Sequence, residues 1–99
     1  MAFERLKFIN PIEDQDRPNN YHIKIVGPPG FEELLKERKF SLGYYQRDLS
    51  GTLEEAQSEA RNLVKKFYAD MAEEAIPIED WRNRIVCSVY ASFMAYEII

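Results

Sequence analysis

Residues 52–75, TLEEAQSEARNLVKKFYADMAEEA, carry the clearest pattern in the chain and decide the fold prediction. At about 3.6 residues per turn, the apolar side chains fall on one stripe and most charged side chains on the opposite side. Thr52 and Glu55 have the spacing of a capping box, in which each side chain accepts a hydrogen bond from the other's backbone N–H. Pro77 ends the run, so we predict one scaffold helix roughly 35 Å long. The apolar stripe consists of Leu53, Ala56, Ala60, Leu63, Val64, Phe67, Met71 and Ala75.

The chain has 99 residues, of which 45% are hydrophobic, enough to form the core of a single domain. Its net charge is −4, and the acidity belongs to residues 41–99, which hold six basic and ten acidic side chains. A generally basic nucleic-acid binder is therefore not indicated. The single cysteine excludes an internal disulfide and favours a reducing compartment. The start lacks an apolar signal region and no apolar run is long enough to cross a bilayer, so we expect a soluble cytoplasmic protein.

Alternating side chains before the long helix predict three short strands, at residues 3–9, 21–26 and 39–47. Residues 10–20 are polar and contain two prolines, which is typical of a surface loop. Residues 31–38 have apolar side chains at helical spacing and predict a short helix between the second and third strands. A strand extension is the alternative for this segment.

After Pro77, a second long helix is expected to begin near Ile78 and to run through WRNRIVCSVYASFMAYEII. The predicted fold class is therefore α+β. A small three-stranded, antiparallel sheet packs against two long C-terminal helices, with the short helix between strands 2 and 3. The connection at residues 27–38 is also long enough for a parallel crossover, which leaves the direction of the third strand open.

The predicted second helix is apolar over more than half of its circumference. Such a helix has to be buried on several sides, and one sheet face and one helix offer limited cover in a small domain. We expect the excess to form a protein interface, through self-association or as a groove for a partner. The alternative is an ordinary central core helix. The candidate partner-binding residues are Trp81, Tyr90, Phe93, Met94 and Ile98.

Strand parity places basic and aromatic side chains on the outer face of the predicted sheet, opposite the helices. Faces of this kind enter a DNA groove or stack RNA bases in some proteins. However, exposed strand faces are normally polar whatever the function. The candidate nucleic-acid-binding residues are Arg5, Lys7, His22, Lys24, Lys39, Tyr45 and Arg47.

Carboxylates gather around the turn between the two predicted helices. They could hold a divalent cation through oxygen ligands or imitate a phosphate backbone. A solvated turn is the simpler interpretation, because no calcium-loop or zinc spacing is present and we expect no metal. The residues of this candidate acidic interaction site are Asp70, Glu73, Glu74, Glu79 and Asp80.

The search for catalytic residues finds one histidine, His22, on a predicted sheet surface, and one cysteine, Cys87, in an apolar segment. Free cysteines are among the most buried residues, so an inert core thiol is favoured over a nucleophile. Sequence separation alone nevertheless leaves a cysteine–histidine pair open. We expect no enzyme and no cofactor, and no family is recognisable from these residues.

Three functional classes follow. The favoured one is a non-enzymatic interaction or regulatory protein that forms a homodimer through its aromatic C-terminal helix. The second is a nucleic-acid-binding module that uses the basic sheet face. The third is a small acidic inhibitor that occupies the nucleic-acid site of another protein.

Overall fold

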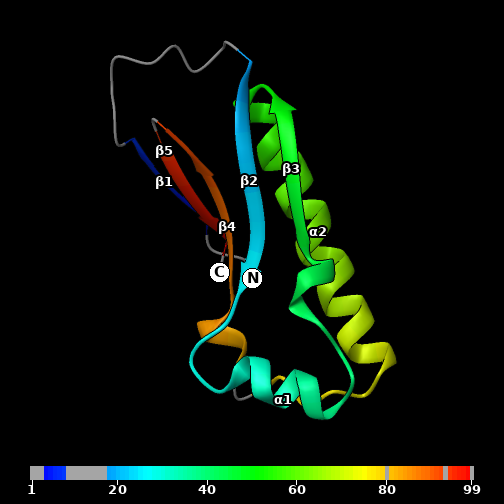
Figure 1. Cartoon of the computed structure of the whole chain (residues 1–99). Helices are drawn as coiled ribbons and strands as arrows, with labels where there is room; N and C mark the ends of the chain where they lie inside the picture. The colour runs from blue at the N-terminus through cyan, green and yellow to red at the C-terminus, as the bar shows by residue number, and fades with distance from the viewer. Residues whose placement is uncertain (1–3, 9–17, 80, 93, 99) are drawn as a thin grey trace.

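The structure is a computed structural model that describes residues 4–8, 18–79, 81–92 and 94–98. Within them the fold is α+β, with a five-stranded sheet in the order β1-β5-β4-β2-β3 and every neighbouring pair antiparallel. The long helix α2 packs along one face of this sheet, and α1 lies across one end (Figure 1). The elements in chain order are β1 (Glu4–Phe8), β2 (Asn19–Val26), α1 (Phe31–Glu37), the 3-10 turn η1 (Leu42–Tyr44), β3 (Gln46–Gly51), α2 (Leu53–Glu73), the 3-10 turn η2 (Arg82–Arg84), β4 (Val86–Ala91) and β5 (Met94–Ile98).

The predicted scaffold helix is confirmed as α2. The Thr52 hydroxyl accepts from the Glu55 backbone N–H at 3.2 Å, and the Thr52 N–H donates to the Glu55 carboxylate at 3.0 Å, so the capping box forms. At the other end the chain leaves the helix through Ala75, whose φ of 54° lies in the left-handed region. The N–H of Ile76 then donates to the Met71 carbonyl at 3.0 Å. This pattern is a Schellman motif, which satisfies carbonyls that the helix end would otherwise leave unpaired.

The predicted short helix is also confirmed, as α1, and the alternative strand extension is wrong. Its residues Phe31 and Leu35 are buried. The helix ends in a second Schellman motif, because Lys39 has a φ of 57° and the Phe40 N–H donates to the Leu35 carbonyl at 2.8 Å. The Phe31 ring meets the Phe67 ring of α2 edge-on, with 6.2 Å between the centroids. Aromatic packing therefore attaches α1 to the C-terminal half of α2.

The prediction of a three-stranded sheet with two long C-terminal helices is wrong. The segment expected to form the second helix contains η2 and an antiparallel hairpin of β4 and β5, in which Ala91 pairs with Met94. Every second side chain of both strands is buried, at Cys87, Val89 and Ala91 in β4 and at Met94, Tyr96 and Ile98 in β5. An apolar stretch with this composition fits a helix or a strand when periodicity alone is judged. Here the segment forms strands because β4 pairs with β2 and β5 pairs with β1.

The predicted third strand, residues 39–47, is also wrong. The chain forms η1 there, where the Ser41 hydroxyl accepts from the Gly43 N–H at 3.1 Å, and the strand β3 begins only at Gln46. Residues 48–51, which follow the predicted strand, also belong to β3. The shift turns Tyr45 inward, at 4% exposure, and leaves Tyr44 77% exposed. A displaced register exchanges the two faces because strand side chains alternate.

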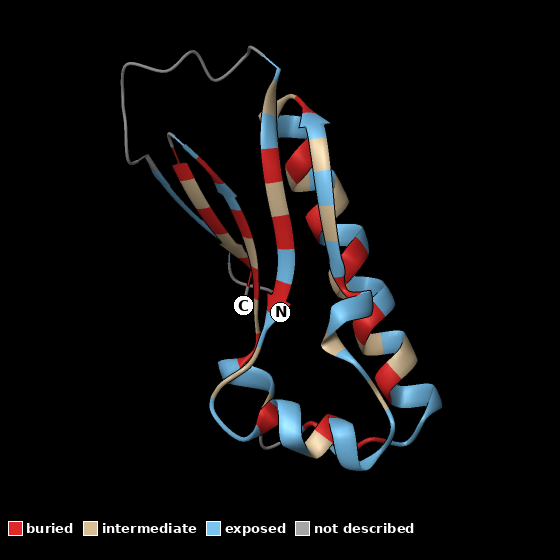
Figure 2. Cartoon of the chain, viewed as in Figure 1, coloured by how far each residue is buried: buried red, intermediate tan, exposed pale blue. Residues whose placement is uncertain are grey.

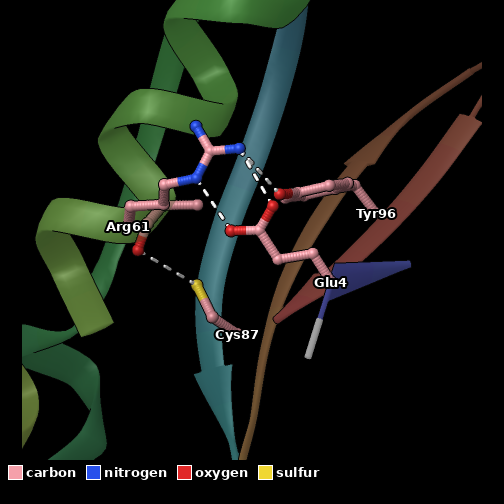
Figure 3. A network of polar contacts seen from close by, with 5 residues as sticks. Glu4, Arg61, Cys87 and Tyr96 are labelled. Atoms are coloured by element: carbon pink, nitrogen blue, oxygen red, sulfur yellow. Dashed lines mark hydrogen bonds and ion pairs between the residues drawn. The ribbon is translucent and has the colours of Figure 1, made fainter. Parts of the chain in front are cut away.

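The core lies between α2 and the sheet. Along β2 the buried and exposed positions alternate, which Figure 2 shows as bands. The edge strand β1 is attached to α2 by Arg61, which donates to both carboxylate oxygens of Glu4, at 2.8 and 3.0 Å, and to the Tyr96 hydroxyl at 3.2 Å (Figure 3). The Arg61 guanidinium, assisted by Tyr96, lowers the pKa of Glu4 to about 2. Neither helix in the described part of the chain combines the length and apolar character needed to cross a membrane.

Candidate functional site: the open face of the sheet

The face of the sheet that points away from α2 has no described element over it. Its side chains come from alternate positions of all five strands, as the strand register requires. We call this surface the open face. It consists of Arg5, Lys7, Asn20, His22, Lys24, Val26, Gln46, Asp48, Ser50, Val86, Ser88, Tyr90, Ala95 and Glu97.

Two rows of side chains cross the open face at right angles to the strands. Each row follows the registered partners from β1 through β5, β4 and β2 to β3. The first row is Lys7, Ala95, Tyr90, His22 and Asp48. The second row is Arg5, Glu97, Ser88, Lys24 and Gln46. The central strand β4 contributes the middle residue of each row.

Charged side chains occupy both sides of β4. Arg5 donates to Glu97 at 2.6 Å, and His22 Nδ1 lies 2.7 Å from Asp48 Oδ1. Tyr90 stands between these pairs with 55% of its surface exposed. A hollow of about 670 Å³ adjoins Tyr90, His22 and Asp48 and continues to Ser50 at the edge of the sheet. The open face therefore has an aromatic centre and charged flanks.

The predicted basic sheet face is only partly assembled. Arg5, Lys7, His22 and Lys24 do lie on the open face. The other three predicted members lie elsewhere, because the third strand begins later than expected. Lys39 follows the C-cap of α1, and Tyr45 is buried. Arg47 points to the α2 side of β3, with its Nε 3.8 Å from Glu59. Arg5, Lys7 and Lys24 share this surface with the carboxylates of Asp48 and Glu97. This mixture of charges suits a protein surface better than a polyanion.

The five candidate partner-binding residues do not form one surface. Met94 and Ile98 are buried in the core, at 0% and 3% exposure. Trp81 is half-buried, with its ring centroid 5.7 Å from that of Phe31, and Tyr90 lies on the open face. Phe93 lies outside the described residues. The helical stripe on which the five residues were grouped does not exist, so only Tyr90 is kept as a contact residue.

The candidate acidic site is also dispersed. Asp70 accepts from the Tyr45 hydroxyl at 2.6 Å and from Lys66 at 3.2 Å, and these bonds, the Tyr45 bond first, lower its pKa. Glu79 lies 4.0 Å from Arg82. Glu73 and Glu74 are exposed at the C-terminal end of α2, and Asp80 lies outside the described residues. Among the residues that the structure describes, no three His, Cys, Asp or Glu side chains are placed to hold a metal ion.

The cysteine and the histidine lie on opposite faces of the sheet. Cys87 is 1% exposed, and its thiol donates to the Ala60 carbonyl of α2 at 3.8 Å (Figure 3). Burial raises the pKa of this thiol to about 12. His22 belongs to the open face, so the two side chains cannot form a nucleophile–base pair, which needs direct hydrogen-bonding contact.

The sequence prediction missed Asp48, Ser88 and Glu97 as members of the open face. The available signal is alternation within residues 46–51, 86–91 and 94–98, which the prediction assigns to other structure. Comparisons with models of protein families, with curated proteins and with solved structures gave no match for this chain. The functional argument therefore starts from the geometry of the open face.

Proposed function

We propose that this chain is a non-enzymatic protein-interaction protein that dimerises by packing the open face of one copy against the open face of another. The observation that carries the proposal is the arrangement of charge on the two sides of β4. In the first row a cation, Lys7, stands at one edge and a carboxylate, Asp48, at the other. In the second row Glu97 and Lys24 occupy the two positions that flank Ser88.

A half-turn about an axis parallel to β4 makes this pattern self-complementary. The operation brings β5 of one copy over β2 of the other, and β1 over β3. Lys7 then faces Asp48 of the second copy and Glu97 faces its Lys24, and each pair forms twice because the contact is isologous. Tyr90 and Ser88 lie on the axis and face themselves. No like charges oppose one another in these two rows.

The geometry of stacked sheets agrees with this arrangement. Two sheets pack face to face about 10 Å apart with their strands roughly aligned, and the proposed axis keeps the strands aligned. The ring of Tyr90 would supply apolar contact at the centre, and the flanking charges would select the register and exclude wrong partners. Five strands about 4.8 Å apart make a face roughly 20 Å wide. That is at the small end of specific interfaces, so we expect a dimer of micromolar affinity.

Sedimentation equilibrium of the purified chain over a range of about 1 to 300 µM tests the proposal, since the mass should rise from monomer to dimer across that range. Lys7→Asp places two carboxylates in contact and should weaken the dimer at least about tenfold, as should Asp48→Lys. The double variant restores opposite charges and should recover the wild-type affinity. Lys65→Asp on the exposed side of α2 is the matched control and should leave the affinity unchanged.

A wild-type chain that stays monomeric over the whole range would overturn the proposal. A dimer that both single variants weaken, but that the double variant does not restore, would overturn the assigned axis. Tyr90→Glu adds an independent check, because it places two carboxylates on the axis itself, whereas the same substitution at exposed Tyr44 leaves the open face intact. Thermal unfolding of each variant separates a lost contact from a lost fold.

A further inference from the structure

On the α2 side of the sheet, a second hollow collects basic and aromatic side chains from residues 39–47 and from α2. It has a volume of about 440 Å³ and lies between the end of α1, η1, the start of β3 and α2. Its lining contains three cationic side chains and no carboxylate. We call it the basic hollow; it is lined by Lys39, Phe40, Ser41, Tyr44, Tyr45, Arg47 and Lys66.

The floor and walls of the basic hollow are held in place. The rings of Phe40 and Tyr45 stack at 10°, with 5.5 Å between centroids. Arg47 Nη1 donates to the carbonyls of Tyr44 and Gln46, at 3.1 and 2.7 Å, which ties β3 to the end of η1. Lys66 is oriented by Asp70 at 3.2 Å. A pocket with fixed walls loses little conformational entropy when a ligand enters.

Lys39 occupies an unusual backbone position at the mouth of this hollow. Its φ of 57° is the left-handed position that glycine normally takes at a helix end. A lysine in this conformation is strained relative to glycine. The chain therefore has a cation at a position where glycine would make the fold more stable. Among the described residues, Lys39 makes no ion pair.

The charge around the basic hollow limits what can bind. Asp70 lies 3.2 Å from Lys66 and Glu59 lies 3.8 Å from Arg47, so three cations and two carboxylates sum to a single net positive charge. A chain of net charge −4 with this local surplus suits one phosphate group and not an extended polyanion. Tyr44, 77% exposed at the rim, offers a flat ring on which a second flat ring can stack.

We infer that the basic hollow binds a mononucleotide, with its phosphate among Lys39, Arg47 and Lys66 and its base stacked on Tyr44. Lys39 and Lys66 act as point charges for the phosphate. Arg47 donates to the phosphate through the guanidinium N–H groups that do not bind the carbonyls of Tyr44 and Gln46. The volume falls within the range of small-molecule sites. Because the hollow lies on the α2 side, a dimer formed through the open face leaves it accessible.

Isothermal titration of the full chain with adenosine 5′-monophosphate, adenosine and inorganic phosphate tests the assignment. The monophosphate should bind at least about tenfold more tightly than either fragment, because only it uses both the cations and the ring. Lys66→Gln and Tyr44→Ala should each weaken it about five- to tenfold, and Tyr44→Phe should keep it. Lys65→Gln on the exposed side of α2, outside both the basic hollow and the open face, is the matched control for lost positive charge.

Lys39→Gly separates a binding role of Lys39 from a purely structural one, because the two roles predict different effects on nucleotide binding. Removing the strain should raise the melting temperature by a few degrees, while losing the cation should weaken nucleotide binding about tenfold. Binding unchanged in this variant would overturn the assignment. So would equal affinity for the monophosphate and inorganic phosphate, or much tighter binding of a single-stranded decanucleotide than of the monophosphate, which would point to a nucleic-acid strand instead.

Discussion

Replacing Ala75 with glycine should stabilise this protein, although it removes a methyl group and adds chain freedom. Ala75 follows the last turn of α2 with a φ of 54°, in the left-handed region where a Cβ atom approaches the following carbonyl oxygen. Its backbone is committed to that conformation, because the Ala75 N–H donates to the Ala72 carbonyl at 3.1 Å and the next N–H donates to Met71. The alanine side chain is exposed, so glycine loses no core contact.

The magnitude follows from two opposing effects. A left-handed conformation costs an L-residue about 1–2 kcal/mol, and glycine avoids this cost. Glycine loses more conformational entropy on folding, which costs about 0.5–1 kcal/mol. The net gain is about 0.5–1 kcal/mol, and since about 1 kcal/mol shifts the melting temperature of a domain this size by about 4–8 °C, we expect a rise of about 4 °C. Ala72→Gly is the matched control: it removes the same methyl group from an exposed helical position and should cost about 1 kcal/mol.

Urea unfolding and thermal melts followed by circular dichroism measure both variants. The two should move in opposite directions, with their melting temperatures about 10 °C apart. If Ala75→Gly destabilised the protein as much as Ala72→Gly does, the helix would not end through a left-handed residue at this position. The account of both helix ends, including Lys39, would then be refuted.

Three further predictions concern single side chains. The pKa of Glu4 is lowered to about 2 by Arg61, so this ion pair stabilises the fold above about pH 4.5 and is lost as the pH falls towards 2. Because both side chains are partly exposed, urea titrations should show wild type about 1 kcal/mol more stable than Glu4→Gln at pH 6, and the difference should vanish near pH 2. A stability difference that does not change with pH would contradict this prediction. The buried Cys87 thiol, with its pKa raised to about 12, should react with a disulfide reagent at pH 8 only after denaturant is added, and rapid reaction of the folded protein would show that it is accessible. Tyr45→Phe removes the 2.6 Å bond to Asp70 and should cost about 1 kcal/mol in urea unfolding, whereas an unchanged stability would mean that water replaces the bond without loss.

Helices and isolated strands were predictable because their signals are local. The capping box of Thr52 and Glu55 and the stripe that follows are complete within residues 52–75, and β1 and β2 show their own alternation. The mixture of predicted strands and helices likewise indicated the α+β class. These features need no knowledge of what each element packs against.

Pairing was decided by the tertiary structure. The residues of β4 and β5 are apolar enough for a buried helix. They form strands because β2 pairs with β4 and β1 pairs with β5 through backbone hydrogen bonds. Arg5 and Glu97, which meet at 2.6 Å, are 92 residues apart, and no local pattern contains such a contact. The start of β3 at Gln46 depends on η1, and this one detail exchanges the faces of Tyr44 and Tyr45.

The candidate sites show the same division. The amino-acid sequence by itself identified four basic residues of the open face, since strand parity is a local property. The rows that make the open face self-complementary combine five strands, and the basic hollow combines side chains of η1, β3 and α2. Helix hydrogen bonds close within four residues, whereas a strand takes its partners from anywhere in the chain. For that reason the scaffold helix could be predicted from its own residues, whereas both binding surfaces could be recognised only in the assembled sheet.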